Sequence, residues 1–148
     1  MITYDAKLKQ KDVLQLHALL KTTYWASERS IDAVRESLKN SVVIFARDES
    51  GDIVGSARAV TDQTTFSWIC DVVVAAPLRG QGIGKHLVSL LLEDERIKCT
   101  RKILVTKDAH GLYEQFGFKS HPYECMICYE GAPQQGGQVD VASRRHLP

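Results

Sequence analysis

The sequence has almost no excess of charge of either sign, because 19 basic residues stand against 18 acidic ones and the formal net charge is +1. A nucleic-acid-binding protein usually has a basic excess, so this balance argues against that class. No apolar run approaches the roughly 20 residues that cross a bilayer, and MITYDAKLKQKD at the start lacks the apolar region of a signal peptide. We therefore expect a cytoplasmic protein with no nucleic-acid or membrane partner.

The sequence also lacks a cysteine framework, because its four cysteines have no tight spacing, which is typical of reduced thiols. Cys125 and Cys128 form a CxxC, but neither a second CxxC nor a histidine pair completes a zinc site. Because the surrounding YECMICY has the composition of a strand, we expect these thiols to be buried and expect no bound metal.

The chain is otherwise ordinary in composition, with 148 residues, 44% of them hydrophobic, which is typical of one globular domain. Apolar periodicity predicts strands at 1–5, 42–46, 53–60, 65–75 and 102–106 and from 118 to CMICY, and helices at 12–23, 31–40, from 83 and at 109–116. Ser30 and Asp108 are the expected N-caps of two of these helices. This order of elements predicts an α+β domain with a mixed sheet over residues 1–130. The Gly/Gln-rich segment 131–148 is expected to be a flexible tail.

A glycine-rich loop lies between the third strand of the expected meander and the following helix, in VVVAAPLRGQGIGKHLVSLLL. Backbone N–H groups at such a helix start can hold a phosphate, and Arg79 and Lys85 add positive charge. The alternative is that the glycines only permit a tight turn. An ATP-binding Walker A loop is excluded, because Arg79 stands where its first glycine belongs and His86 replaces its Ser or Thr. A dinucleotide site is excluded by the GxGxG spacing and by the position after a third strand.

Two blocks of the sequence resemble the GNAT superfamily of acyl-CoA-dependent N-acetyltransferases. The family loop, Arg or Gln, two residues, Gly, one residue, then Gly or Ala, is matched by Arg79, Gly82 and Gly84. The second block, an aromatic or apolar residue, Tyr, three residues, then Gly-Phe, is matched by Leu112, Tyr113, Gly117 and Phe118. The resemblance implies a three-layer α/β/α fold with a mostly antiparallel central sheet that is splayed where the cofactor enters.

The resemblance also implies acetyl-CoA as cofactor. The loop amides would bind its pyrophosphate and the preceding strand would pair with its pantetheine arm, which assigns Arg79, Gly80, Gln81, Gly82, Ile83, Gly84 and Lys85 in the loop and Val72, Val73 and Val74 in the strand. The backbone N–H of Val72 would polarise the thioester carbonyl, as in an oxyanion hole.

Tyr113 occupies the position of the tyrosine that protonates the leaving thiolate in the family, while its helical spacing also fits an ordinary core residue. In the family, a carboxylate that acts as the general base often lies at the position that Trp68 occupies here. This sequence has no acidic residue at that position, so it does not identify the general base. Asp71, in the apolar ICDVVV, is either a structural hydrogen-bonding residue or a functional one, and ordered water is equally possible. Alternation places Asp71 on the opposite face of its strand from Val72.

The acyl acceptor is expected near a link between the first two helices, where Tyr24, Trp25 and Arg29 can line a pocket, and near Arg58 and Asp62 in the meander. Arg58 lies in a mainly apolar strand and needs a partner, which could be Asp62, Asp71 or a substrate carboxylate. The alternative is that these are ordinary surface residues, as we expect of His86, His110 and His121.

The resemblance implies an N-acetyltransferase that transfers acetyl directly to a primary amine of a small molecule or peptide, as a monomer or homodimer. A non-catalytic acyl-CoA-binding or sensor domain on the same fold is the alternative function. A melting curve with acetyl-CoA, free CoA and ATP distinguishes both from a nucleotide-binding module.

Overall fold

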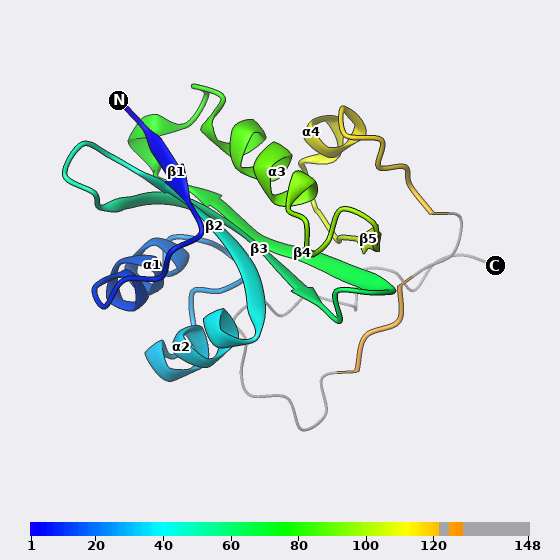
Figure 1. Cartoon of the computed structure of the whole chain (residues 1–148), viewed down its shortest axis with the longest axis horizontal. Helices are drawn as coiled ribbons and strands as arrows, with labels where there is room; N and C mark the ends of the chain where they lie inside the picture. Colours follow the sequence, from blue (N-terminus) through cyan, green and yellow to red (C-terminus); the bar gives the residue numbers. More distant parts are fainter. Residues whose placement is uncertain (122–124, 129–148) are drawn as a thin grey trace, which may run out of the picture.

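The computed structural model describes residues 1–121 and 125–128, and within them the strands form one sheet in the order β1-β2-β3-β4-β5 (Figure 1). The strands are β1 (Thr3–Asp5), β2 (Ser41–Arg47), β3 (Ile53–Thr61), β4 (Phe66–Val74) and β5 (Arg101–Ile103). The pairings from β1 to β4 are antiparallel, and β5 pairs with β4 in parallel. The expected mixed, mostly antiparallel sheet is confirmed.

The helices cover the sheet on both sides, which gives the three layers (Figure 1). They are α1 (Asp12–Leu20), α2 (Ile31–Lys39), α3 (Ile83–Glu93) and the short α4 (His110–Glu114), and a 3-10 turn, Ala76–Leu78, precedes α3. The helices α1 and α2 pack on one face, and α3 packs across β2, β3 and β4 on the other.

The core of each face draws alternate residues from the same strands. In β2, Val42 and Ile44 pack in the cluster on the α3 side, whereas Val43 and Phe45 pack in the cluster on the α1–α2 side. Because both faces of β2 are buried, apolar residues are favoured at successive positions rather than at alternate ones, which explains the unbroken apolar run of this strand. Full burial of each such side chain contributes roughly 1.5–3 kcal/mol to folding.

A buried ion cluster joins the first strand and helix to β2. The Arg47 guanidinium, only 1% exposed, donates to Asp12 Oδ1 and Oδ2 at 2.8 Å each and to Asp5 Oδ2 at 2.8 Å. Burial would raise the pKa values of both carboxyl groups, but the hydrogen bonds and charge of Arg47, together with backbone hydrogen bonds and the charge of Lys9, outweigh it and lower them. The cluster fixes β1 and α1 against the sheet.

The helix ends follow side-chain hydrogen bonds. The Ser30 hydroxyl accepts from the Ala33 N–H at 3.1 Å, so the predicted N-cap of α2 is confirmed. The first helix ends at Leu20 rather than at the predicted Thr23. The reason is that the Thr23 hydroxyl donates to the Leu20 carbonyl at 2.7 Å and accepts from the Ala26 N–H at 3.2 Å, which forms a separate turn.

Three sequence predictions near the end of the described chain are wrong. Asp108 does not cap α4, because the N-cap is Ala109 and the Thr106 hydroxyl accepts the Ala109 N–H at 3.0 Å. The described residues 118–121 and 125–128 lie in no strand, because no strand of the described sheet pairs with them. Cys125 and Cys128 are exposed rather than buried, which the loss of that strand explains. The expected tail, 131–148, lies outside the described residues.

Candidate functional site

The start of α3 is an open helix N-terminus formed by glycines. Gly82 is the N-cap of α3 and has φ 79°, and because it has no side chain it accepts no capping hydrogen bond from the helix. Gly80, two residues earlier, has the same φ. The first backbone bond back into the helix is from the His86 N–H to the Gly82 carbonyl at 3.0 Å, which leaves the N–H groups of the first turn available. A Cβ on Gly80 or Gly82 would meet nothing within 4 Å, so both are needed for backbone conformation. The two interpretations of the glycine loop are therefore compatible, because the glycines permit the tight turn and the turn leaves N–H groups that can bind an anion.

The strand that leads into this loop has an open edge. β5 pairs only with residues Phe66–Trp68, and beyond them no described strand pairs with β4 on that side. The Ala75 N–H donates to the Val54 carbonyl at 2.8 Å. Strand alternation therefore directs the N–H groups of Val74 and Val72 away from β3, toward this open edge. On the same side, Arg79 Nε donates to the Val74 carbonyl at 3.0 Å.

A β-bulge at Asp71 interrupts β4 before the open edge. The register with β3 shifts between Ser56 and Arg58, and Asp71 has φ 50°. Ile69 before the bulge packs in the core cluster on the α3 side, and Val73 after it packs on the α1–α2 side. The bulge thus turns the Asp71 carboxylate toward the link between α1 and α2. Asp71 lies on the face opposite Val72, as expected.

The Asp71 carboxylate is held by three donors and is 4% exposed. It accepts from Arg29 Nη1 at 2.6 Å, from Arg58 Nε at 2.8 Å and from Trp25 Nε1 at 3.2 Å. Burial would raise the pKa of Asp71, but the two guanidinium groups outweigh it, so the pKa is lowered. A carboxylate that is ionised, buried and fully engaged is a poor proton acceptor, which favours the structural interpretation of Asp71.

Of the partners considered for Arg58, the structure selects Asp71. Arg58 Nη1 also donates to the Ser41 hydroxyl at 2.9 Å. Asp62 instead holds the β3–β4 turn, where its Oδ1 accepts the N–H groups of Thr64 and Thr65 at 2.9 and 2.8 Å. The Thr65 hydroxyl bond lowers the pKa of this exposed carboxyl further below its usual range.

Tyr113 is positioned by the way α4 ends. The Phe118 N–H donates to the Tyr113 carbonyl at 3.3 Å, and the Gly117 N–H donates to the Glu114 carbonyl at 3.0 Å, with Gly117 at φ 84°. This is a Schellman motif, and its usual apolar contact is present because the Phe118 ring packs edge-on against Tyr113 at 5.8 Å. The spacing Tyr, three residues, Gly-Phe is therefore the sequence of a helix stop that fixes the tyrosine ring.

Tyr113 is only 9% exposed. Burial raises the pKa of Tyr113, with smaller electrostatic contributions from Cys70 and Tyr24. Its hydroxyl has no hydrogen-bond partner among the described residues. Burial also raises the pKa of Cys70 to about 11, so this thiol stays protonated at neutral pH and is a poor nucleophile.

The comparisons with known proteins agree with this geometry. A model of the acetyltransferase (GNAT) family matches residues 11–118, a range that includes the α3 loop, the β4 edge and α4. The chain belongs to the GNAT family.

Among relatives of this GNAT chain, an uncharacterized N-acetyltransferase, ycf52, of Pyropia yezoensis is 28% identical over 125 residues, covering 80% of this chain and 71% of the relative. The glucosamine 6-phosphate N-acetyltransferase of Trypanosoma brucei brucei is 36% identical over 93 residues, covering 57% and 63%. A solved GNAT-family structure from Xanthomonas campestris pv. campestris superposes with a TM-score of 0.77 at 26% identity, covering 86% of this chain and 94% of that one.

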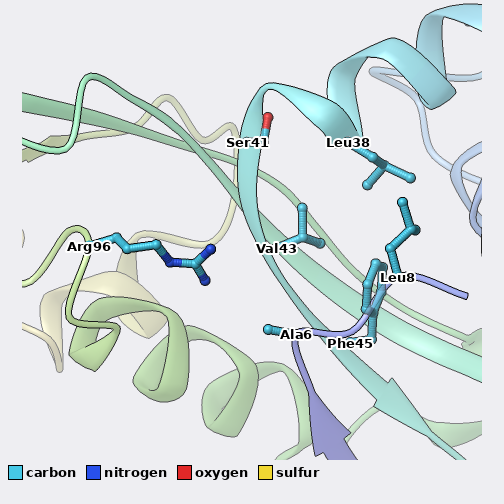
Figure 2. A pocket seen from close by; sticks show the side chains of 7 residues that line it. All are labelled: Ala6, Leu8, Leu38, Ser41, Val43, Phe45 and Arg96. Carbon is cyan, nitrogen blue, oxygen red and sulfur yellow. The ribbon is translucent and has the colours of Figure 1, made fainter.

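Two of the hollows on the surface of the GNAT domain are lined by described residues. An open groove runs beside the start of α3 and is lined by Gly82, Lys85, His86, Ser89 and Phe116. The second lies at the edge of β2 beyond β1, and Figure 2 shows Arg96 on the other side of β2 from Leu38. It is lined by Ala6, Leu8, Leu38, Ser41, Val43, Phe45 and Arg96.

Sequence reasoning missed some of these features. No sequence motif predicts the groove beside α3 or the hydrogen bond between Ser41 and Arg58. The only signal in the sequence is that Ser41 is a polar residue at the start of an apolar strand. His86 is exposed as expected, and its ring contacts Tyr4 at 4.4 Å. Among the described residues, no group of three His, Cys, Asp or Glu residues could hold a metal. In the same part of the chain, no helix has the length and apolar character to cross a membrane.

Proposed function

We propose that this GNAT protein is an acetyl-CoA-dependent N-acetyltransferase that transfers acetyl directly to a primary amine of a small molecule or peptide within a ternary complex. The observation that carries the proposal is the continuous path from the open β4 edge to the uncapped start of α3, with Tyr113 nearby. Acetyl-CoA, when bound, supplies the activated thioester. Relatives named N-acetyltransferase, one of them acting on glucosamine 6-phosphate, support an amine acceptor.

The main chain provides the cofactor contacts in this proposal. The amides from Arg79 to Lys85 bind the pyrophosphate, because a glycine-rich helix start presents free N–H groups and a positive dipole end. Val72, Val73 and Val74 offer an unpaired strand edge on which the pantetheine arm adds like a further strand. The N–H of Val72 donates to the thioester carbonyl oxygen as negative charge develops there, a contribution of about 3 kcal/mol to transition-state stabilisation.

Tyr113 acts as the general acid. Its raised pKa keeps the phenol protonated at neutral pH, and its hydroxyl is available to donate to the departing thiolate. Because the three donors occupy Asp71, the amine loses its proton to ordered water rather than to this carboxylate. Tyr24 and Arg58 contact the acceptor, while Asp62 takes part only through the turn that it holds.

The test is Tyr113→Phe. We expect kcat for amine acetylation to fall by roughly 10²- to 10⁴-fold, with the dissociation constant of acetyl-CoA unchanged. The hydroxyl makes no hydrogen bond to the described residues of the fold, so the variant should melt near the wild-type temperature. Tyr4→Phe, which alters a ring packed against His86, is the matched control and should keep full activity.

Two outcomes would contradict the proposal in different ways. An unchanged rate in Tyr113→Phe would remove the assigned role of Tyr113 alone. Acetyl-CoA binding without transfer to any member of a broad amine panel would instead favour the non-catalytic acyl-CoA sensor.

A further inference from the structure

The cluster formed by Arg29, Arg58 and Asp71 has more positive than negative charge. Two guanidinium groups, 8% and 12% exposed, share one carboxylate, so the net charge of the cluster is +1. Each guanidinium has five N–H donors. In the described part of the chain, Arg29 uses one side-chain nitrogen on Asp71, and Arg58 uses one on Asp71 and one on Ser41.

The residues around this arginine cluster do not neutralise it. Glu28, next to Arg29, is exposed and forms no ion pair among the described residues. Lys107 adds positive charge on the Tyr24 side, with its Nζ 5.6 Å from the centre of the Tyr24 ring. The electrostatic potential around the cluster is thus positive, although the net charge of the whole chain is close to zero.

A nearly buried cation without a counter-ion costs folding free energy unless an anion or a hydrogen-bond acceptor pairs with it. None of the buried side-chain polar atoms in the described structure lacks a partner, so the unused guanidinium nitrogens are those that solvent reaches. Guanidinium donors that point to solvent match carboxylate and phosphate oxygens in geometry and charge. The observation therefore indicates a ligand with carboxylate or phosphate oxygens.

The position of the cluster indicates which ligand. Asp71 directly precedes Val72 at the open edge of β4, and Trp25, which donates to Asp71 at 3.2 Å, packs edge-on against Tyr24 at 5.0 Å in the α1–α2 link. The arginines therefore stand on the acceptor side of the reaction centre. Building on the function proposed above, we infer that the acceptor amine carries an oxyanion, a carboxylate or a phosphate, which Arg29 and Arg58 bind so that the amine is aimed at the thioester.

The activity test uses matched acceptor pairs that differ in the anion. Serine is compared with serine amide for a carboxylate, and phosphoethanolamine with ethanolamine for a phosphate. We expect kcat/KM to favour the anionic member of at least one pair by roughly 10- to 100-fold, and the favoured pair identifies the anion. Equal use of both members, or preference for the neutral ones, overturns the inference and leaves the proposed function intact.

Variants separate charge from structure. Arg58→Gln lowers the net charge of the cluster to zero and should reduce the preference by about tenfold or more. Arg58→Gln with Asp71→Asn restores a net charge of +1 and should recover part of the preference. Arg35→Gln removes an exposed arginine of α2 that pairs with Asp32 and is the matched control. An unchanged preference in Arg58→Gln overturns the inference, provided that acetyl-CoA still raises the melting temperature of that variant.

A binding test does not depend on turnover. Trp68→Phe leaves Trp25, whose indole donates to Asp71, as the sole tryptophan. Phosphate and acetate, titrated at constant ionic strength, should change its fluorescence saturably, and Arg58→Gln should abolish the change. A saturable response without acetyl transfer to any amine supports the anion site while contradicting the proposed enzyme. Transfer without anion preference or fluorescence response overturns the anion site alone.

Discussion

Replacing Asp71 with Asn is the sharpest stability test of the buried network. Asn keeps the shape of the side chain and tolerates the φ of 50° at this position, so the variant removes little besides the charge. Arg29 and Arg58 then remain nearly buried without a counter-ion. Removing one partner of a buried ion pair costs about 3–5 kcal/mol. In a chain of this length, that loss lowers the melting temperature by roughly 10 °C.

The assay is urea unfolding followed by tryptophan fluorescence, with the slope m used to verify that both proteins unfold in a two-state manner. Asp32→Asn is the matched control, because Asp32 pairs with Arg35 on the surface of α2 and its side chain is 82% exposed. It should change the free energy of unfolding by less than about 1 kcal/mol. If Asp71→Asn also stays within about 1 kcal/mol of wild type, the three donors do not stabilise the fold as argued.

Two further predictions concern pH and the glycine loop. The folded pKa of Asp71 is below its unfolded value of about 3.9, so its stabilisation is complete above that pH and is lost as the pH falls through the folded pKa. The difference in unfolding free energy between wild type and Asp71→Asn should thus be constant between about pH 5 and 7 and shrink below about pH 4; an opposite trend would contradict the shift. Gly82→Val forces a β-branched residue to φ 79°, and should cost about 1–2 kcal/mol and weaken acetyl-CoA binding. Gly51→Val, at φ 75° in the β2–β3 turn, should cost a similar amount and bind acetyl-CoA normally, and equal binding by both variants would exclude the loop as the pyrophosphate site.

Most of the architecture could be predicted from local patterns in the sequence. The apolar run of β2, the Ser30 cap and the glycine turn before α3 each depend on residues close together in the chain. The same holds for the end of α4, where Gly117 and Phe118 form a helix stop within five residues of Tyr113. Such signals are readable because propensity, capping and positive φ act over a few residues.

The long-range pairings were not readable in the same way. Arg29 and Asp71 are 42 positions apart, and the sequence offered Asp62 as an equally good partner for Arg58. Which carboxylate an arginine meets depends on sheet register, and here a bulge shifts the register within β3 and β4. The expected last strand failed for a related reason, because strand composition alone does not provide a neighbouring strand with which to pair.

The bulge also lets β4 hold one residue more than its two cores require. Ile69 and Val73 are four residues apart, a spacing that would place them on one face of a regular strand, yet they pack in opposite cores. Deleting one residue between them would leave them three apart, so a regular strand without the bulge would keep both side chains on their present faces. The extra residue is therefore not required by either core. It allows β4 to direct the Asp71 carboxylate to Arg29 on the α1–α2 side while Val72 packs on the α3 side.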